Sequence, residues 1–402
     1  MNQSSNAITV ATLLLTVVTD IMGMGLVFPV LPTIFSSATN PFHLNDNNLF
    51  MLYCITMMIV PIGWSISGVI MGKLSDVLGR KKVILISLIA STLSYGFCVM
   101  ALNTHLLTLF IFARLIIGLG SGSYSLVQTV MTDIAPEGKL GKYMGWVNAA
   151  SAIGFVMGAL LTMFFSFVYG ANENYYIFPF YGGFILCLIN TILVYLFISE
   201  THQPKSSRTI KLFDFNISKE LTYLLILFSQ LEIAWGIFLQ TSPIMLDHIY
   251  FANSYEISVY YFLNGLCAVL CIFFVQPWFE KHFSYEKATY GLALITAFFM
   301  VLLSVKTNFI TFTVLMFLMT FFEFLLYISL LVQITKNSPE GSRGMVMGMV
   351  SSIIGISFLV SDLFMLVMSE SYISLNFFIA AFVLPIYNIK FSNFYFRSSV
   401  SQ

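Results

Sequence analysis

The sequence predicts an all-α integral membrane protein in which twelve transmembrane helices form two six-helix bundles related by pseudo-symmetry. Three observations support this fold class: a strongly apolar composition, twelve apolar segments long enough to cross a bilayer, and a motif that recurs half a chain later. The chain has 402 residues, of which 58% are hydrophobic and 9% are charged. Soluble domains carry about 25% charged residues, so much of this apolar surface is expected to face lipid.

The net charge and the positions of the cysteines limit which nucleic-acid or metal partners can be expected. The net charge is zero, which gives no electrostatic reason to expect a nucleic-acid partner. All five cysteines fall in apolar stretches. Cys267 and Cys271 have the helical spacing of a metal-binding pair, but no His or carboxylate lies near them in the sequence, and buried Cys usually behaves as a small hydrophobe. No metal site and no cofactor are therefore predicted.

The transmembrane segments follow from length, since a helix needs about 20 mostly apolar residues to cross a bilayer. Six segments precede a long polar stretch and six follow it. Only Lys306 to Asn308 separates the ninth segment from the tenth. The predicted spans are 8–34, 50–72, 83–102, 106–132, 143–169, 176–199, 221–246, 257–279, 288–305, 308–334, 344–368 and 372–389.

The positions of the basic residues predict the orientation. The loops between spans are counted from the N-terminus, so that even-numbered loops all lie on the same side of the membrane. Apart from Arg114 and Lys306, every Lys and Arg lies in an even-numbered loop, in the central polar stretch or near the C-terminus. Loops rich in Lys and Arg face the cytoplasm. We therefore expect a multi-pass protein of the cell inner (cytoplasmic) membrane with both termini in the cytoplasm.

The polar stretch divides the chain into two halves. We predict an N-terminal bundle over 1–199, a cytoplasmic linker over 200–220 and a C-terminal bundle over 221–402. The sequence Pro136-Glu137-Gly138 recurs as Pro339-Glu340-Gly341 at the corresponding place in the second half, and a Gly-x-x-Met-Gly pattern follows both copies. Two parallel six-helix repeats are a known architecture of membrane transporters.

The loop between the second and third spans, GKLSDVLGRKK, resembles the signature loop of the major facilitator superfamily. Val77 departs from the family pattern, which usually has a basic residue there. The resemblance implies a gating loop in which Asp76 sits against the positive N-terminus of the eleventh helix. The matching residues are Gly72, Asp76, Gly79, Arg80 and Lys82.

Two further patterns are similar to those of one branch of this family. Arg114, Gly118 and Gly120 in the fourth span match the helix-4 motif of the family. In the first span, Asp20 precedes two glycines and two prolines in the pattern of the drug:proton antiporters, especially those of the tetracycline-exporter type. The resemblance covers most of the first half, whereas the second half matches only in topology and in the repeat.

The fifth span departs from the antiporter signature. Two glycines of the signature remain, Gly154 and Gly158, but Phe155 stands where the signature has proline. Small residues allow helices to pack closely in membranes, so we expect both glycines at a helix contact. Antiport as such is less strongly indicated than membership of the family.

Charged residues occur in only five of the predicted spans. A charge at the centre of a bilayer costs at least about 2.5–3.5 kcal/mol, so these side chains are expected to face protein or water. In the major facilitator fold the first, fourth, seventh and tenth helices line the central cavity, and four of the five charges lie on those helices. The five residues are Asp20, Arg114, Glu232, Glu323 and Asp362.

We predict that Asp20, Arg114, Glu232 and Glu323 take part in proton coupling or substrate binding. Arg114 and Asp20 form the natural ion pair, either as a joint between two helices or as a contact that protonation of Asp20 releases. Glu232 is the first candidate for a coupling acid, because it lies near the middle of its span, where carriers bind substrate. Glu323 is the second. Asp362 lies nearer the external end of its span, so a solvated or helix-packing role is expected at least as much as a role in transport.

The predicted function is export of small, partly hydrophobic organic compounds by a carrier that exchanges them for protons. The expected partners are a small organic substrate, protons and the lipid bilayer, and the family implies a monomer. The alternative is a dedicated carrier of a physiological metabolite, such as a siderophore, an amino acid or a nucleoside, working by export or uptake. An enzyme is not expected, because the sequence lacks clustered His, Ser or Asp residues and a His-Glu-x-x-His motif. An ATP-binding loop is also missing from the sequence, so an ion gradient is the expected energy source.

Overall fold

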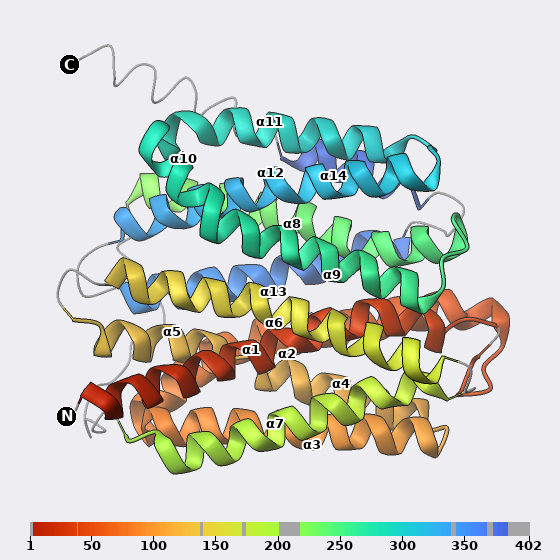
Figure 1. Cartoon of the computed structure of the whole chain (residues 1–402), viewed down its shortest axis with the longest axis horizontal. Helices are drawn as coiled ribbons and strands as arrows, with labels where there is room; N and C mark the ends of the chain where they lie inside the picture. Colours follow the sequence, from red (N-terminus) through yellow and green to blue (C-terminus); the bar gives the residue numbers. More distant parts are fainter. Residues whose placement is uncertain are drawn as a thin grey trace. The chain divides into compact units, whose positions relative to one another are not determined.

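The structure is a computed structural model of the chain, and Figure 1 shows the arrangement of its helices. It describes residues 3–37, 39–136, 140–170, 174–200, 218–338, 343–367 and 373–384. Within those ranges every regular element is a helix, which confirms the all-α prediction. The helices before the central polar stretch are α1 (Gln3–Ile34), α2 (Asp46–Leu78), α3 (Arg80–Asn103), α4 (Leu107–Gly120), α5 (Ser123–Ile134), α6 (Leu140–Tyr169), η1 (Tyr175–Ile177) and α7 (Phe178–Phe197).

The helices after the central stretch begin with α8 at Lys219. Residues 305–308 separate α11 from α12, close to the predicted boundary between the ninth and tenth spans. The helices are α8 (Lys219–His248), α9 (Ser254–Leu270), η2 (Cys271–Val275), α10 (Gln276–His282), α11 (Tyr285–Ser304), α12 (Phe309–Lys336), α13 (Arg343–Val367) and α14 (Leu375–Val383).

Ten helical segments among the described residues are long and apolar enough to cross a membrane. They correspond to ten of the twelve predicted spans. The ninth predicted span contains a shorter apolar helix, Ala288–Ser304, and the twelfth is described only as the nine residues of α14. The multi-pass character is therefore established, while the number of twelve stays a prediction.

The fourth predicted span is not one continuous helix. It consists of α4 and α5, which a turn at Ser121 and Gly122 separates. Glycines on both sides of Ser121 lower the helix propensity here. The Ser121 hydroxyl also donates to the carbonyl oxygen of Ile117 at 2.9 Å, a contact that bends helices. The span predicted over 106–132 is confirmed as Leu107–Met131, with a turn inside it that the prediction did not include.

The eighth predicted span also has an irregular segment. The π-helical turn η2 connects α9 with α10, and Pro277 lies at the start of α10. Proline has no N–H to donate and its ring clashes with the preceding turn of an α-helix. A wider π turn before Pro277 accommodates this clash.

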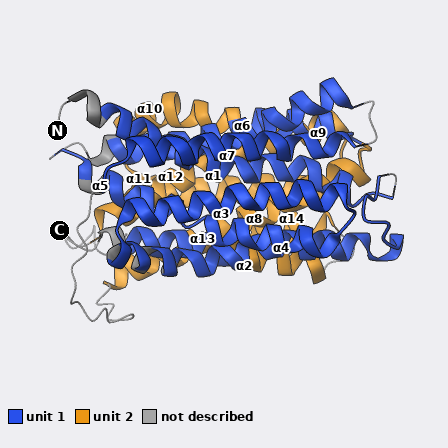
Figure 2. Cartoon of the chain, turned by 90° about the horizontal axis from the view of Figure 1, so that it is seen from below, with its two compact units in different colours: residues 1–215, 252–265, 344–356 blue, residues 216–251, 266–343, 357–402 orange. Residues whose placement is uncertain are grey.

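The chain divides into two compact units (Figure 2). Unit 1 comprises residues 1–215, 252–265 and 344–356. Unit 2 comprises residues 216–251, 266–343 and 357–402. The predicted division into bundles over 1–199 and 221–402 stays a prediction, and residues 201–217 of the predicted linker lie outside the described residues. The repeat copy at Pro339 to Gly341 and the C-terminus after residue 384 also lie outside them.

In unit 1, α1 packs against α5, α6 and α7, while α3 packs against α4 and α7 (Figure 1). Glycines allow the closest of these approaches. A Cβ atom added to Gly158 would lie 2.5 Å from the backbone nitrogen of Leu26, and one added to Gly154 would lie 2.6 Å from the carbonyl oxygen of Val18. A Cβ on Gly25 would in turn collide with the backbone of Phe155. Helices α1 and α6 therefore meet backbone to backbone.

In unit 2, α12 packs against α8 and α11, and α14 packs against α8 and α11. Polar side chains join α11 to α12 in the buried interior. The Gln333 amide donates to the Thr289 hydroxyl at 2.8 Å, and the Thr289 and Ser329 hydroxyls are hydrogen-bonded at 2.7 Å. Because each of these buried groups has a partner, the network stabilises the helix pair in an apolar setting.

Candidate functional site

Two carboxylic acids lie at the centres of two neighbouring helices of unit 2. Glu232 is the fourteenth of the 30 residues of α8, and Glu323 is the fifteenth of the 28 residues of α12. Their side chains are 2% and 1% exposed. Glu323 interacts electrostatically with Glu232, so the structure brings the two predicted acids close together.

Neither acid is fully hydrogen-bonded. Glu232 Oε1 and Glu323 Oε2 are buried and have no hydrogen-bond partner within the described part of the chain. Leaving a buried polar atom unsatisfied costs about 1–3 kcal/mol, and more when the group is charged. In a native protein such atoms call for a physical explanation.

Aromatic contacts between α8 and α12 lie on both sides of Glu232 along α8, and their partners on α12 follow Glu323. The rings of Phe228 and Tyr327 lie 5.6 Å apart, and those of Trp235 and Phe324 lie 5.6 Å apart in an edge-to-face arrangement. The residue numbers of the contacts rise along α8, from Phe228 to Trp235, while those of their partners fall along α12, from Tyr327 to Phe324. The two helices are therefore antiparallel. Aromatic rings next to two acids provide apolar contact surface beside groups that can carry negative charge.

Asp362 belongs to α13 and is fully buried, with 0% exposure, so a solvated role for it is wrong. Its neighbour Ser361 donates to the carbonyl oxygen of Ile233 at 2.8 Å, and Ser357 donates to that of Ser229 at 3.2 Å. These two hydroxyls join α13 to the segment of α8 that carries Glu232. Asp362 thus directly follows a residue at the contact between α13 and α8.

The structure brings one acid close to Cys267 and Cys271. A carboxylate does lie near them, because Glu323 interacts electrostatically with both thiols. The sequence does not show this proximity, because α12 approaches η2, which begins at Cys271, only through the tertiary fold. Among the described residues, no group of three or more His, Cys, Asp or Glu side chains is arranged to hold a metal ion.

In unit 1, Asp20 has a described partner that the sequence analysis did not identify. The hydroxyl of Ser123, in the first residue of α5, donates a short hydrogen bond to Asp20 Oδ2. The break between α4 and α5 positions this hydroxyl. Arg114 is 5% exposed in the middle of α4, and its pairing with Asp20 stays a prediction. Both Asp20 and Arg114 interact electrostatically with Tyr95 of α3.

The predicted gating loop forms the junction of α2 and α3. Gly79 has φ +94°, a conformation that suits glycine. The backbone N–H of Arg80, the first residue of α3, donates to Glu200 Oε1 at 2.7 Å. Lys81 donates to the carbonyl oxygen of Tyr195 at 2.8 Å. The side chain of Asp76 lies outside the described part of the structure, as does the environment of Gly72, so the predicted role of Asp76 stays untested.

Glu200 therefore contributes to the junction although the sequence analysis assigned it only to the linker. It follows α7 and supplies an acceptor and a negative charge to the N-terminus of α3, where unpaired N–H groups make both favourable. Lys81 also lies 5.6 Å from the centre of the Tyr195 ring. The end of α7 and the start of α3 are thus fastened by two side chains.

Gly118 and Gly120 of α4 both lie against other helices. A Cβ on Gly118 would lie 3.0 Å from Val60 Cα in α2, and one on Gly120 would lie 2.7 Å from Ser91 Oγ in α3. The Ser94 hydroxyl of α3 donates to the carbonyl oxygen of Ala113 at 2.5 Å. These small residues set the spacing of α4 from α2 and α3.

Phe155, which replaces the signature proline, belongs to an aromatic group in unit 1. Its ring lies 6.3 Å from Phe28 and 6.0 Å from Tyr261, and the Phe28 and Tyr261 rings stack at 5.5 Å. A Cβ added to Gly265 would lie 3.1 Å from the Phe155 ring. The substitution thus exchanges a helix-bending residue for an aromatic contact among α1, α6 and α9.

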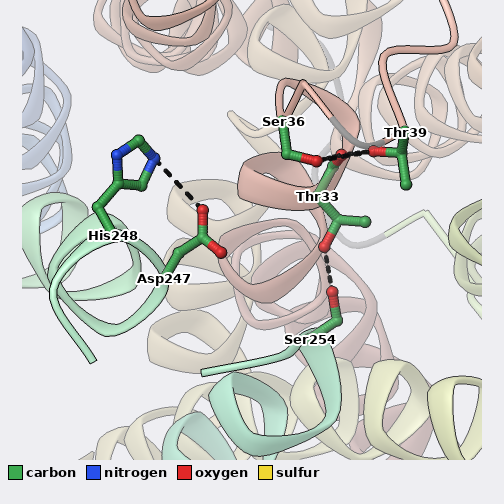
Figure 3. Close-up of polar contacts among 6 residues, drawn as sticks. All are labelled: Thr33, Ser36, Thr39, Asp247, His248 and Ser254. Atoms are coloured by element: carbon green, nitrogen blue, oxygen red, sulfur yellow. Dashed lines mark hydrogen bonds and ion pairs between the residues drawn. The ribbon is translucent and has the colours of Figure 1, made fainter. Parts of the chain in front are cut away.

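Hydroxyl groups join α1 and α9 near their ends in unit 1 (Figure 3). The Thr33 and Ser254 hydroxyls are hydrogen-bonded. The Tyr175 hydroxyl also donates to Ser254 at 2.8 Å. Thr39 also donates to the carbonyl oxygen of Thr33, and its hydroxyl is 3.0 Å from that of Ser36. In unit 2, His248 lies 3.3 Å from the carboxylate of its neighbour Asp247 at the end of α8.

Among the described residues, ten helical segments are long and apolar enough to cross a membrane, and several carry a buried charged side chain near the middle. These features are those of a multi-pass membrane protein, and buried charges of this kind commonly mark transport pathways. The family model of the Major Facilitator Superfamily matches residues 13–361, and the chain belongs to this family. This confirms the resemblance found in the sequence. It also confirms that the chain is not an enzyme, because the family consists of transporters.

The relatives agree with the tetracycline-exporter-like branch. The chain is 31% identical over 149 residues to the class H tetracycline resistance protein of Pasteurella multocida, which covers 37% of this chain and 35% of that protein. It is 28% identical over 209 residues to the class B protein of Escherichia coli, covering 52% of this chain and 47% of that protein. These matches span about a third to a half of the relatives' length.

Solved structures of the same fold cover nearly the whole chain. The proton:xylose symporter XylE is 15% identical, with a TM-score of 0.74, and the match covers 98% of this chain and 96% of that one. The human organic anion transporter MFSD10 is 17% identical, with a TM-score of 0.68 over 94% of this chain and 99% of that one. At these identities the likeness establishes the fold alone.

Proposed function

We propose that the chain is a proton-coupled secondary transporter of the cell inner membrane that exports small, partly hydrophobic organic compounds by alternating access. In this proposal both termini face the cytoplasm and the carrier works as a monomer. Asp20 with Arg114 in unit 1, and Glu232 with Glu323 in unit 2, are the groups that exchange protons or contact substrate.

The observation that carries this proposal is the pair of buried acids on α8 and α12. Each has an oxygen without a hydrogen-bond partner among the described residues, at the centre of a helix that can cross the membrane. An isolated charge there is expensive, and a bound proton or a cationic or hydrogen-bond-donating substrate removes that cost. If a proton and a substrate compete for the same acid pair, binding of one releases the other, which is a physical basis for exchanging substrate for protons.

Export is supported by the relatives. The proteins named above are tetracycline resistance proteins, and outward transport of a drug is one direct way for a membrane transporter to confer resistance. Because the matches cover at most about half of those proteins, tetracycline itself is a candidate substrate to be tested rather than an assignment.

The first experiment measures accumulation of fluorescent hydrophobic cations and of tetracycline in a pump-deficient host that expresses the chain. We expect lower accumulation than in the empty host, and restoration of accumulation by a protonophore. Unchanged accumulation of every probe, with the protein verified in the membrane, would contradict broad drug export and favour a dedicated carrier of a siderophore, an amino acid or a nucleoside.

The role of the acid pair is tested with Glu232→Gln, which keeps the shape of the side chain and removes its ability to ionise. We expect loss of protonophore-sensitive export at a normal level of folded protein. Glu280→Gln is the matched control, because Glu280 lies in the same unit and is exposed. Export by Glu232→Gln that equals the wild-type rate would remove Glu232 from the proposal.

A further inference from the structure

Tyr95 of α3 occupies a space that two glycines create in unit 1. Its side chain is 1% exposed. A Cβ on Gly183 of α7 would lie 2.7 Å from the Tyr95 ring, and one on Gly23 of α1 would lie 2.8 Å from the Tyr95 hydroxyl oxygen. Any side chain larger than glycine at either position would have to displace the tyrosine.

The hydroxyl oxygen of Tyr95 is buried and has no hydrogen-bond partner among the residues that the structure describes. Buried tyrosine hydroxyls usually find a partner, and a phenylalanine would fill the same space without the cost of an unsatisfied polar group. The hydroxyl therefore calls for an explanation beyond packing.

The surroundings of this hydroxyl supply the explanation. Gly23 follows Asp20 by three residues, so both lie on the same face of α1. Tyr95 interacts electrostatically with Asp20 and with Arg114 of α4. The other titratable groups that act on it are Cys187 of α7 and Cys98 of its own helix. Of these neighbours, Asp20 is the one acid and Arg114 the one permanent cation.

We propose that Tyr95 is a positioning residue that bridges Arg114 and Asp20 during the transport cycle. A tyrosine hydroxyl accepts one hydrogen bond and donates another. It therefore accepts from the Arg114 guanidinium while it donates to the ionised carboxylate of Asp20. Once Asp20 is protonated, Ser123 remains as its partner, which is the contact present in this structure. The proposal rests on the proposed role of Asp20 in proton exchange.

The test follows the protonation of Asp20 directly and needs no transport substrate. A hydrophobic carbodiimide, dicyclohexylcarbodiimide, reacts with protonated carboxyl groups in apolar surroundings, and mass spectrometry of the Asp20 peptide gives the extent of reaction across a pH series. With Tyr95→Phe, we expect the pH midpoint of labelling to rise by about one unit, because the ionised carboxylate has lost a hydrogen-bond donor.

The matched control is Tyr176→Phe. Tyr176 is 2% exposed in the same unit, and its hydroxyl donates to Asn174 at 2.9 Å rather than facing Asp20. We expect this variant to keep the wild-type midpoint. A Tyr95→Phe protein with the wild-type midpoint would overturn the inference while leaving proton coupling through Asp20 intact. Absence of labelling at Asp20 in the wild type at every pH would overturn both the inference and the role of Asp20 in the proposed function.

Discussion

The backbone N–H of Arg80 donates a hydrogen bond to the carboxylate of Glu200 at 2.7 Å, although 120 positions separate the two residues. The residue before Arg80 is Gly79, and a Cβ atom there would collide with the same carboxylate. The glycine of the signature loop therefore leaves room for the Glu200 carboxylate, which accepts a hydrogen bond from the next residue of the loop. The start of α3 depends on a residue that lies in another part of the chain.

This relationship predicts that Glu200→Ala destabilises the protein. Loss of the acceptor exposes an unpaired N–H at the start of α3, which costs about 1 kcal/mol. We expect a lower midpoint of thermal unfolding in detergent, with a smaller loss for Glu200→Gln, which keeps an acceptor oxygen. Glu280→Ala is the control, since Glu280 is exposed and caps no helix in the described structure. Equal midpoints for Glu200→Ala and the control would contradict the capping role.

Helix packing through Gly158 gives a second prediction. The Cβ of Gly158→Ala would meet the backbone of α1 at Leu26 and Gly25, and backbone cannot rotate away as a flexible side chain can. We expect a loss of about 1–3 kcal/mol in stability from this overpacking. Gly145→Ala in the same helix is the matched control, because no atom beyond its own stretch of helix lies within 4 Å of its added Cβ. Circular-dichroism melts of the two variants would distinguish them, and equal melting would argue against a close α1–α6 contact.

The proximity of Glu232 and Glu323 predicts a stability effect that depends on pH. When alkaline conditions ionise both groups, two like charges lie buried together with no cation among the described residues of α8 and α12 near their centres. Glu323→Gln removes that repulsion. We expect it to raise the free energy of unfolding at alkaline pH by roughly 1–3 kcal/mol relative to wild type, with little change at acidic pH.

Thermal unfolding at a series of pH values measures this effect, with Glu280→Gln as the control. The double variant Glu232→Gln/Glu323→Gln is expected to add little to the single one, because neighbouring groups that act together are not additive. A Glu323→Gln protein whose stability follows the wild-type pH dependence would mean that the two acids do not interact in the folded protein.

Much of the fold could be predicted from hydrophobicity alone. Ten of the twelve apolar segments correspond to helices able to span a membrane, and the boundary near Lys306 was correctly identified from a single basic residue between two apolar runs. The break at Ser121 and the π turn before Pro277 were missed. Both depend on local backbone preferences that average hydrophobicity does not register, although the glycines and the proline were visible in the sequence.

The candidate sites were predictable only in part. Charges in apolar spans are costly, and this identified Glu232, Glu323 and Asp20 from the sequence. Their partners could not be identified in the same way. Ser123 and Tyr95 are ordinary residues of membrane helices until the tertiary structure brings them to Asp20.

The central claim, that proton exchange at the acid pair of unit 2 drives transport, is tested most directly with purified protein in liposomes. An imposed pH gradient is applied while movement of tetracycline or a fluorescent hydrophobic cation is followed. We expect the wild type to move the probe against its gradient only while the pH gradient lasts, and Glu232→Gln to lose this response while Glu280→Gln retains it. Gradient-driven transport by Glu232→Gln at the wild-type rate, or transport by the wild type that ignores the pH gradient, would contradict the claim.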